Sequence, residues 1–277
     1  MLVGLLMLAG GVAAGGFGSL LGLGGGVLIV PLLTLGFGLP AREAVGVSLI
    51  CVIVTSSATS GVYLERHLAN LRLGMTLELF TASGALLGSA VAFLLSEQLL
   101  SLLFALLLLF VAVTMLRGGS ADALVGDPEE PEAGSSTDDA PARPDSLDRL
   151  SGDGYRVRNL GLGVVGATGA GVVSAVLGIG GGIVKVPLMH LAMGVPLRVA
   201  AATSNMMIGI TAAASAVIYV IHGGIDPYVA GPTAIGVFLG ATAGSRLGHR
   251  IDLRYLRWLF VVVLAFTASQ LLLRVVR

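Results

Sequence analysis

Eight apolar runs divide this chain of 277 residues, and each is long enough to cross a lipid bilayer. A helix needs roughly 20 mainly apolar residues to span a hydrocarbon core of about 30 Å. Only 12% of the residues are charged, against about a quarter in an ordinary soluble domain. A soluble globular fold is therefore excluded, and an all-α polytopic membrane protein is predicted. The runs lie at 2–21, 43–64, 74–95, 98–116, 158–177, 198–221, 228–248 and 255–275.

Two shorter apolar stretches, 27–37 and 183–194, follow the first and fifth runs across blocks of glycine at 22–26 and 178–182. Each glycine inside a helix costs about 1 kcal/mol relative to alanine, so the helix is expected to break at both blocks. Neither stretch can cross a bilayer alone. They are interpreted as half-helices, whose broken backbone must be satisfied by protein or by a water-filled cavity.

The chain repeats itself at a shift of 156 residues, which is the distance from Gly22 to Gly178. We interpret it as two homologous repeats of about four spans, 1–117 and 157–277, each opening with a glycine-broken helix. Paired repeats in a helical membrane protein are typical of transporters. The same shift pairs Pro31 with Pro187, Gly38 with Gly194, Pro40 with Pro196, Arg42 with Arg198, Ala44 with Ala200, Ser48 with Ser204, Thr55 with Thr211, Tyr63 with Tyr219, Gly84 with Gly240 and Gly88 with Gly244.

Segment 118–156 joins the two repeats and holds ten of the 16 acidic residues, together with many Pro, Ser and Gly. It has too few large apolar residues to form a core, and an acidic disordered linker is predicted.

Arginine placement bears on orientation, because short cytoplasmic loops are enriched in Lys and Arg. Loop 65–73 of the first repeat and loop 246–257 of the second carry arginines, although they are not equivalent loops. Inverted repeats are therefore predicted, with the linker and the basic loops cytoplasmic. A parallel arrangement stays open, since Arg42 and Arg198 occupy matched positions.

The glycine blocks are the first candidate binding groups. Successive glycine N–H groups, together with the positive end of the following short helix, form a natural seat for an anion. Two such breaks that converge near the midplane would build a substrate site. The alternative is that the glycines only allow close helix packing. The residues assigned to the site are Gly24, Gly25, Gly26, Gly180, Gly181 and Gly182.

Lys185 lies three positions after Gly182, inside a short apolar helix. A buried ammonium group costs several kcal/mol unless an anion is close to it, so an anionic neighbour is expected. A substrate is one candidate for that anion. The first repeat has Ile29 at the matched position. The alternative is that Lys185 lies shallow and extends its amine to the membrane interface.

Hydroxyl and amide groups near the start of two spans complete the predicted site. Thr203, Ser204 and Asn205, with Ser48 at the position matched to Ser204, can donate to an oxyanion, although helix capping is the more common use of such residues.

Glu78 and His190 are further ionisable groups inside apolar runs and are candidates for proton coupling. Placement near an interface is the alternative for both.

Several activities find no support in the sequence. The glycine blocks lack the spacing of a dinucleotide fingerprint and no Walker-type lysine follows them, so no nucleotide cofactor is expected. No cluster has metal-ligand spacing, and no catalytic constellation is present. No basic stripe with interleaved aromatic residues is found, so nucleic acid is not an expected partner. The protein is predicted not to be an enzyme.

The two copies of Gly-x-Gly-Gly-Gly-hydrophobic-x-x-x-Pro, followed by Ala-x-x-x-Ser or Ala-x-x-Thr-Ser-Asn, resemble the sulfite exporter TauE/SafE family of membrane transporters. The resemblance covers both repeats. It implies a prokaryotic plasma-membrane protein that moves small anions such as sulfite, sulfonates or related organosulfur compounds. The first repeat departs from the pattern, with Val47-Ser48-Leu49 where the second has Thr203-Ser204-Asn205.

These observations together predict a secondary transporter of small sulfur-containing anions that works by alternating access. Its expected partners are the anionic substrate and the lipid bilayer, and homo-oligomerisation stays open. Two alternatives remain, an anion channel that uses the same helix breaks and a membrane scaffold or receptor that works through the acidic linker.

Overall fold

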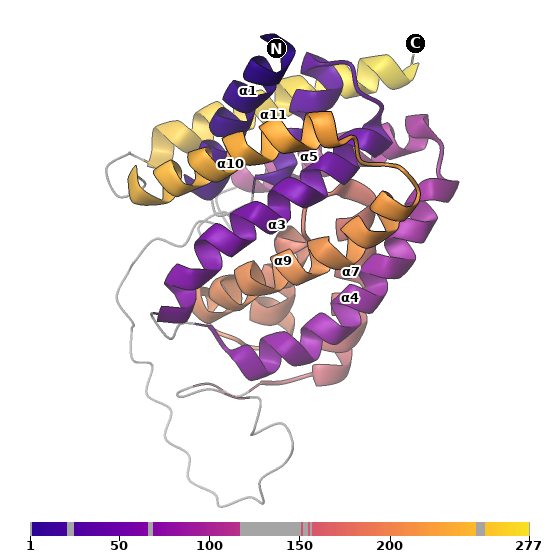
Figure 1. The fold of residues 1–277 in the computed structure, drawn as a ribbon. Coiled ribbons are helices and arrows are strands. Elements are labelled where there is room, and N and C mark those ends of the chain that lie inside the picture. Colours follow the sequence, from indigo (N-terminus) through magenta and orange to yellow (C-terminus); the bar gives the residue numbers. More distant parts are fainter. Residues whose placement is uncertain are drawn as a thin grey trace, which may run out of the picture.

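A computed structural model describes residues 2–20, 25–65, 69–116, 151, 155, 157–247 and 253–276, and the regular elements within these ranges are helices (Figure 1). A long helix lies at each of the eight apolar runs. The predicted acidic linker falls almost entirely outside the described residues. The long helices are α1 (Leu2–Leu20), α3 (Ala41–Glu65), α4 (Leu71–Leu94), α5 (Glu97–Leu116), α7 (Leu160–Leu177), α9 (Leu197–Ile221), α10 (Pro227–Leu247) and α11 (Leu253–Val276).

Six of these helices, α1, α3, α4, α5, α7 and α9, are long and apolar enough to cross a membrane, judged over the described residues. The predicted spans are confirmed for these six by length and composition. Within the described residues, an apolar stretch of α11 runs over Trp258–Arg274, and α10 is not among the candidate spans. Spanning by α10 and α11 therefore stays a prediction.

The two glycine-rich breaks are followed by short helices. Helix α2 (Gly26–Pro31) continues into the π-helical turn η1 (Leu32–Gly36), and α8 (Gly182–Pro187) continues into η2 (Leu188–Ala192). The proline that ends each α-helical part has no N–H to donate, and the wider π turn begins directly after it. These elements match the predicted half-helices, whereas residues 21–24 lie outside the described chain.

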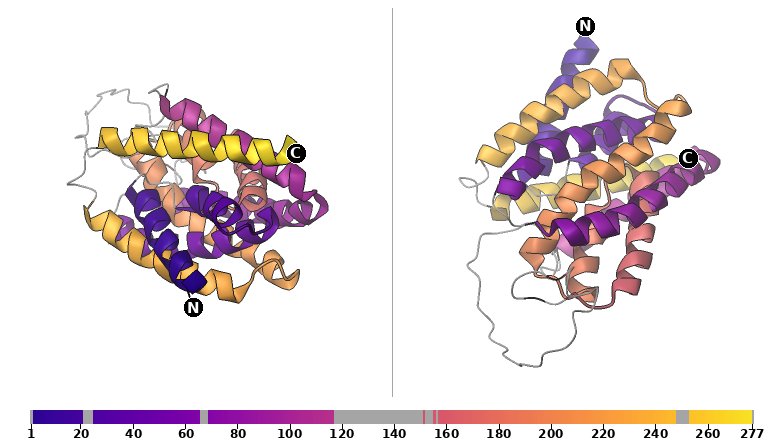
Figure 2. Two further views of the ribbon diagram at one scale, coloured as in Figure 1. Left: turned by 90° about the horizontal axis from the view of Figure 1, so that it is seen from above. Right: turned by 60° about the horizontal axis from the view of Figure 1, so that its bottom comes forward.

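Helices α4 and α7 pack side by side through glycines, as do α1 and α10 (Figures 1 and 2). A Cβ atom at Gly84 would lie 2.1 Å from the carbonyl oxygen of Thr168, and one at Gly88 would lie 2.6 Å from that of Val172. Because both contacts advance by one turn in the same direction, α4 and α7 run parallel. In the other pair, Gly236, Gly240 and Gly244 lie against Leu8, Val12 and Gly16, so α1 and α10 also run parallel.

Gly84→Ala is expected to lower the free energy of unfolding by about 1–3 kcal/mol, because the added methyl group would overlap the Thr168 carbonyl of α7. Thermal unfolding in detergent measures the change. Gly169→Ala is the matched control, since a Cβ atom at that position on α7 meets nothing within 4 Å. Equal melting temperatures for the two variants would show that close approach of α4 and α7 does not need Gly84.

Helices α3 and α9 cross at the centre and run in opposite directions. Near the start of α3, Gly46 lies against Tyr219 and Gly224 at the end of α9. Further along α3, Ser56 donates a hydrogen bond of 2.8 Å to the carbonyl oxygen of Asn205, near the start of α9. Gly25, directly before α2, and the break that precedes α8 lie beside this crossing, inside the bundle.

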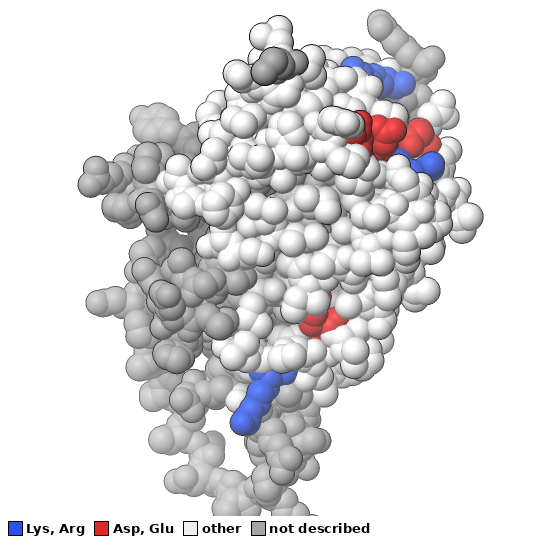
Figure 3. All heavy atoms as spheres, viewed as in Figure 1, with Lys and Arg blue, Asp and Glu red and all other residues white. Residues whose placement is uncertain are grey.

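The outer surface is apolar. Figure 3 shows one face, on which charged side chains form two groups toward opposite ends, separated by a broad uncharged band. Large apolar side chains point outward from the long helices, and lipid would cover them. The fold is therefore that of a multi-pass membrane protein. Examples of these outward side chains are Leu5, Leu79, Leu94, Phe110, Val165 and Phe266.

Candidate functional site

The start of α2 meets the second glycine break at the centre of the molecule. A Cβ atom at Gly26 would lie 2.8 Å from the carbonyl oxygen of Gly178 and 3.2 Å from Cα of Ile179. The hydroxyl of Ser48 donates to the Gly178 carbonyl at 2.7 Å and lies 3.3 Å from the Gly26 carbonyl. Ser48 therefore links Gly26, at the start of α2, to Gly178. Gly25 directly precedes α2 and is buried, whereas Gly24 lies outside the described residues.

The segment that leads into α8 takes a backbone path that favours glycine. Gly178, Gly180 and Gly181 have φ values of 67°, 75° and 79°, in the left-handed region that other residues rarely adopt. Side chains also crowd this segment: a Cβ atom at Gly180 would lie 2.4 Å from Ile208, and one at Gly182 would lie 2.7 Å from the same residue. The glycines of this segment therefore let neighbouring side chains approach its backbone closely.

Two buried hydroxyl groups border this segment without a hydrogen-bond partner in the part of the chain that the structure describes. They are Oγ of Ser174 on α7 and Oγ of Ser204 on α9. A Cβ atom at Gly181 would lie 3.2 Å from Cβ of Ser174, and one at Gly182 would lie 3.7 Å from Oγ of Ser204. Buried polar groups normally form hydrogen bonds, so both hydroxyls are available to donate to a ligand.

Lys185, on α8, lies beside the same segment and is 1% exposed. Its Cε would lie 3.4 Å from a Cβ atom at Gly181. The amine is enclosed by the protein. It forms an ion pair of 3.2 Å with Oε2 of Glu78, which projects from α4. The expected anionic neighbour of Lys185 is therefore a residue of the protein in this structure.

Thr211, on α9, completes a closed triad with the ion pair. Its hydroxyl accepts a hydrogen bond from Nζ of Lys185 and donates one of 2.6 Å to Oε1 of Glu78. All three side chains are buried, and they come from three different elements. Glu78 thus lies in the interior of the protein.

The triad occurs on one side of the molecule only. At the matched positions of the first repeat, Lys185 corresponds to Ile29 and Glu78 to Ala234, while Thr211 corresponds to Thr55. Ile29 and Ala234 contribute to the apolar core. The two glycine breaks therefore differ in charge although they match in sequence.

The structure places three other predicted site residues away from the triad. Thr203 accepts a hydrogen bond of 2.9 Å from the backbone N–H of Asn70, the residue that caps α4. Asn205 is half-buried, and its backbone carbonyl accepts a hydrogen bond from the Ser56 hydroxyl. His190 lies in η2, where Nδ1 is 3.0 Å from the carbonyl oxygen of Val195.

Two residues around the second break were not predicted as site residues from the sequence. Ser174 lies one helical turn before Gly178, and a hydroxyl directly before a glycine block was the available signal. Thr211 could be placed on a polar track of α9, but its partners lie on α4 and α8 and no local pattern reveals them.

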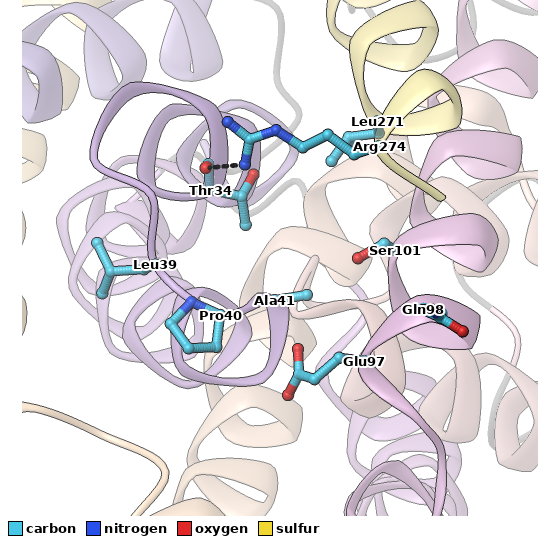
Figure 4. A pocket seen from close by; sticks show the side chains of 9 residues that line it. All are labelled: Thr34, Leu39, Pro40, Ala41, Glu97, Gln98, Ser101, Leu271 and Arg274. Carbon is cyan, nitrogen blue, oxygen red and sulfur yellow. Dashed lines mark hydrogen bonds between the residues drawn. The ribbon is translucent and has the colours of Figure 1, made fainter. Parts of the chain in front are cut away.

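A cavity of about 230 Å³ opens elsewhere, among η1, the starts of α3 and α5 and the end of α11 (Figure 4). Arg274 reaches into this region and donates to the backbone carbonyl of Thr34 at 2.9 Å. None of the predicted site residues lines it. Among the described residues, no group of three or more His, Cys, Asp or Glu could hold a metal ion.

Irregular backbone and a buried ion pair at the centre of an apolar helical bundle define a multi-pass membrane protein of the transporter class. A family model described as Sulfite exporter TauE/SafE matches residues 7–271. The chain therefore belongs to the sulfite exporter TauE/SafE family of membrane transporters, which is not a class of enzymes.

Curated relatives are named as transporters. The chain is 24% identical over 270 residues to the probable membrane transporter protein YunE of Bacillus subtilis, covering 95% of this chain and 94% of YunE. It is 27% identical over 235 residues to a probable membrane transporter protein of Xylella fastidiosa, covering 84% and 80% of the two chains. It is also 25% identical to the probable membrane transporter protein MamO of Paramagnetospirillum magneticum, covering 98% of this chain but 44% of MamO. No solved structure shows significant similarity.

Proposed function

We propose that this protein is a secondary transporter of small sulfur-containing anions, such as sulfite, sulfonates or related organosulfur compounds. The observation that carries the proposal is the group of unsatisfied donors beside a buried cation. Ser174 and Ser204 offer two free hydroxyls next to Lys185 and the bare backbone around Gly181. An oxyanion has several acceptor oxygens, so it can take hydrogen bonds from all of these groups at once.

The proposed binding groups are Gly180, Gly181, Gly182, Lys185 and Ser204, with Ser174 added from the structure. Gly25, Gly26 and Ser48 of the other break support them from the opposite side, where Ser48 holds the Gly178 carbonyl. Thr203 and Asn205 would help by positioning the start of α9 against α3 and α4.

Access to this site requires movement of the helices, because Lys185, Ser174 and Ser204 are each at most 1% exposed. We propose alternating access, in which the site opens to one side of the membrane at a time. The antiparallel crossing of α3 and α9 is the proposed hinge region. We place the protein in the plasma membrane, since export of an anion requires the membrane that bounds the cell.

The helix pairs support two inverted repeats, 1–117 and 157–277. The 156-residue shift converts α3 into α9, and these two helices run antiparallel. It also converts the α1–α10 contact into the α7–α4 contact, because Gly240 against Val12 corresponds to Gly84 against Thr168. A two-fold axis in the membrane plane relates such repeats, and the glycine breaks would meet beside it.

Purified protein in liposomes is expected to carry radiolabelled sulfite above the rate of empty liposomes, and the initial rate should saturate with concentration because a carrier binds its substrate. Competition by taurine and methanesulfonate measures the range of sulfur anions accepted. A rate that rises without saturation would indicate an anion channel. No protein-dependent sulfite flux and no competition in binding assays would contradict the proposed substrate class.

A further inference from the structure

Glu78, the counterion of Lys185, competes with the proposed substrate for the same ammonium group. Glu78 and Thr211 occupy two of the three N–H donors of the Lys185 ammonium group. The free hydroxyls of Ser174 and Ser204 lie on the side of the glycine segment. An anion bound there approaches the same ammonium group that Glu78 already neutralises.

Two negative charges beside one positive charge are unfavourable in this setting. Charges of like sign a few ångströms apart repel far more strongly in a protein interior than in bulk water, because the effective dielectric constant is lower. Glu78 is largely shielded from solvent, with 4% of the residue exposed. A carboxylate that loses its cation in such an environment takes up a proton instead, because an unpaired buried charge costs more.

We propose, resting on the proposed function, that Glu78 is an exchangeable counterion that couples each transported anion to one proton. In the unloaded protein, the Glu78 carboxylate pairs with the Lys185 ammonium group. When the anion binds to that ammonium group, Glu78 accepts one proton from the solution to which the site is open. Release of the anion on the other side returns that proton to the solution there, and the ion pair forms again.

Among the described side chains, Glu78 is the only group beside Lys185 that can take up and release the proton. Helix α7, which packs along α4, contains no titratable residue. On α9, Arg198 and Tyr219 lie more than two helical turns from Thr211, and Tyr219 donates to the Ala175 carbonyl. Lys185 is the only charged residue of α8.

Two further titratable groups lie near the same elements. His190 of η2 is turned to the Val195 carbonyl, and Tyr155 accepts a hydrogen bond from the Asn70 side chain at the start of α4. Both are thus engaged away from the ion pair.

Exchange of this kind keeps the charge of the binding site constant. The empty site holds one positive and one negative residue, and the loaded site holds the lysine cation, the anion and a neutral Glu78. For a singly charged anion both states are neutral, which lowers the cost of enclosing the site inside the membrane between its two open states. Transport of such an anion with one proton is then electroneutral, whereas a dianion carries one net negative charge.

The test uses proteoliposomes with labelled sulfite and, as a probe whose charge is −1 at every pH used, labelled methanesulfonate. A pH difference of one unit at zero membrane potential is expected to drive about tenfold accumulation of a carried singly charged anion on the alkaline side, because each 1.4 kcal/mol corresponds to a factor of ten. A potassium diffusion potential is expected to change its flux less than twofold. Accumulation that follows the potential and ignores the pH difference would overturn the inference.

Glu78→Gln mimics the protonated carboxyl group. It is expected to abolish accumulation driven by pH, to make flux of the singly charged anion depend on membrane potential, and to lower the half-saturating concentration, since no carboxylate competes for Lys185. His190→Asn is the matched control, because its amide can replace the Nδ1 contact with Val195, and pH-driven accumulation should persist.

The wild-type measurement decides the inference even if Glu78→Gln fails to fold. Saturable flux with no response to the pH difference refutes proton coupling and leaves the proposed function standing. Absence of protein-dependent flux of either anion refutes both. Persistence of pH-driven accumulation in folded Glu78→Gln refutes the role of Glu78.

Discussion

Replacement of Lys185 by methionine is expected to lower the free energy of unfolding by about 3–5 kcal/mol, because Glu78 must then either hold a buried charge without its cation or take up a proton. Glu78→Met should cost a similar amount, since the ammonium group of Lys185 then lies unpaired. The double replacement removes both charges and is expected to recover most of the loss. Unfolding in mixed micelles, followed by tryptophan fluorescence or circular dichroism, provides the double-mutant cycle.

The ion pair between Arg42 and Glu97 offers the control for this cycle. Its atoms lie 3.8 Å apart, and the side chains are 28% and 45% exposed. A solvated pair of this kind contributes about 0–1 kcal/mol, so Glu97→Gln should change stability little. If Lys185→Met were no more harmful than Glu97→Gln, the Lys185–Glu78 pair would not be a closed interior contact.

The positions and lengths of the apolar runs were sufficient to locate the long helices among the described residues, because a membrane span is a local property of about 20 consecutive residues. The short helices were also local, since the glycine blocks and the prolines that follow them determine where the helix breaks. The position of Lys185 inside an apolar stretch predicted an anionic neighbour, and the structure places Glu78 there. That this anion is Glu78 could not be predicted, because the two residues are 107 positions apart and meet only when α4 packs against α7 and α9, the helices beside α8.

Matched sequence positions also turned out to differ in environment. Ser48 and Ser204 correspond under the repeat, yet Ser48 donates to Gly178 while Ser204 has no partner among the described residues. Thr203, directly before Ser204, instead accepts a hydrogen bond from the backbone N–H of Asn70. These differences arise from helix orientation and from contacts between the halves, which a pattern read along one chain does not contain.

Ser204→Ala is expected to separate stability from transport. Its hydroxyl is buried and unpaired, so its removal should leave the free energy of unfolding unchanged or raise it by up to about 1 kcal/mol. If the hydroxyl donates to the anion, loss of a hydrogen bond to a charged group costs about 1.5–3 kcal/mol, which raises the half-saturating sulfite concentration roughly 10- to 100-fold. Thermal unfolding and concentration-dependent sulfite flux measure the two effects on the same preparation.

Ser89→Ala provides the opposite pattern and thereby the control. Ser89 on α4 is as deeply buried as Ser204, but its hydroxyl donates to the Ala85 carbonyl within its own helix at 2.8 Å. Its replacement removes a satisfied hydrogen bond and no substrate contact, so stability should fall slightly while the half-saturating concentration stays constant. An unchanged half-saturating concentration in Ser204→Ala would exclude this hydroxyl from the anion site. A rise in that variant alone, without loss of stability, is the result that a substrate-binding hydroxyl requires.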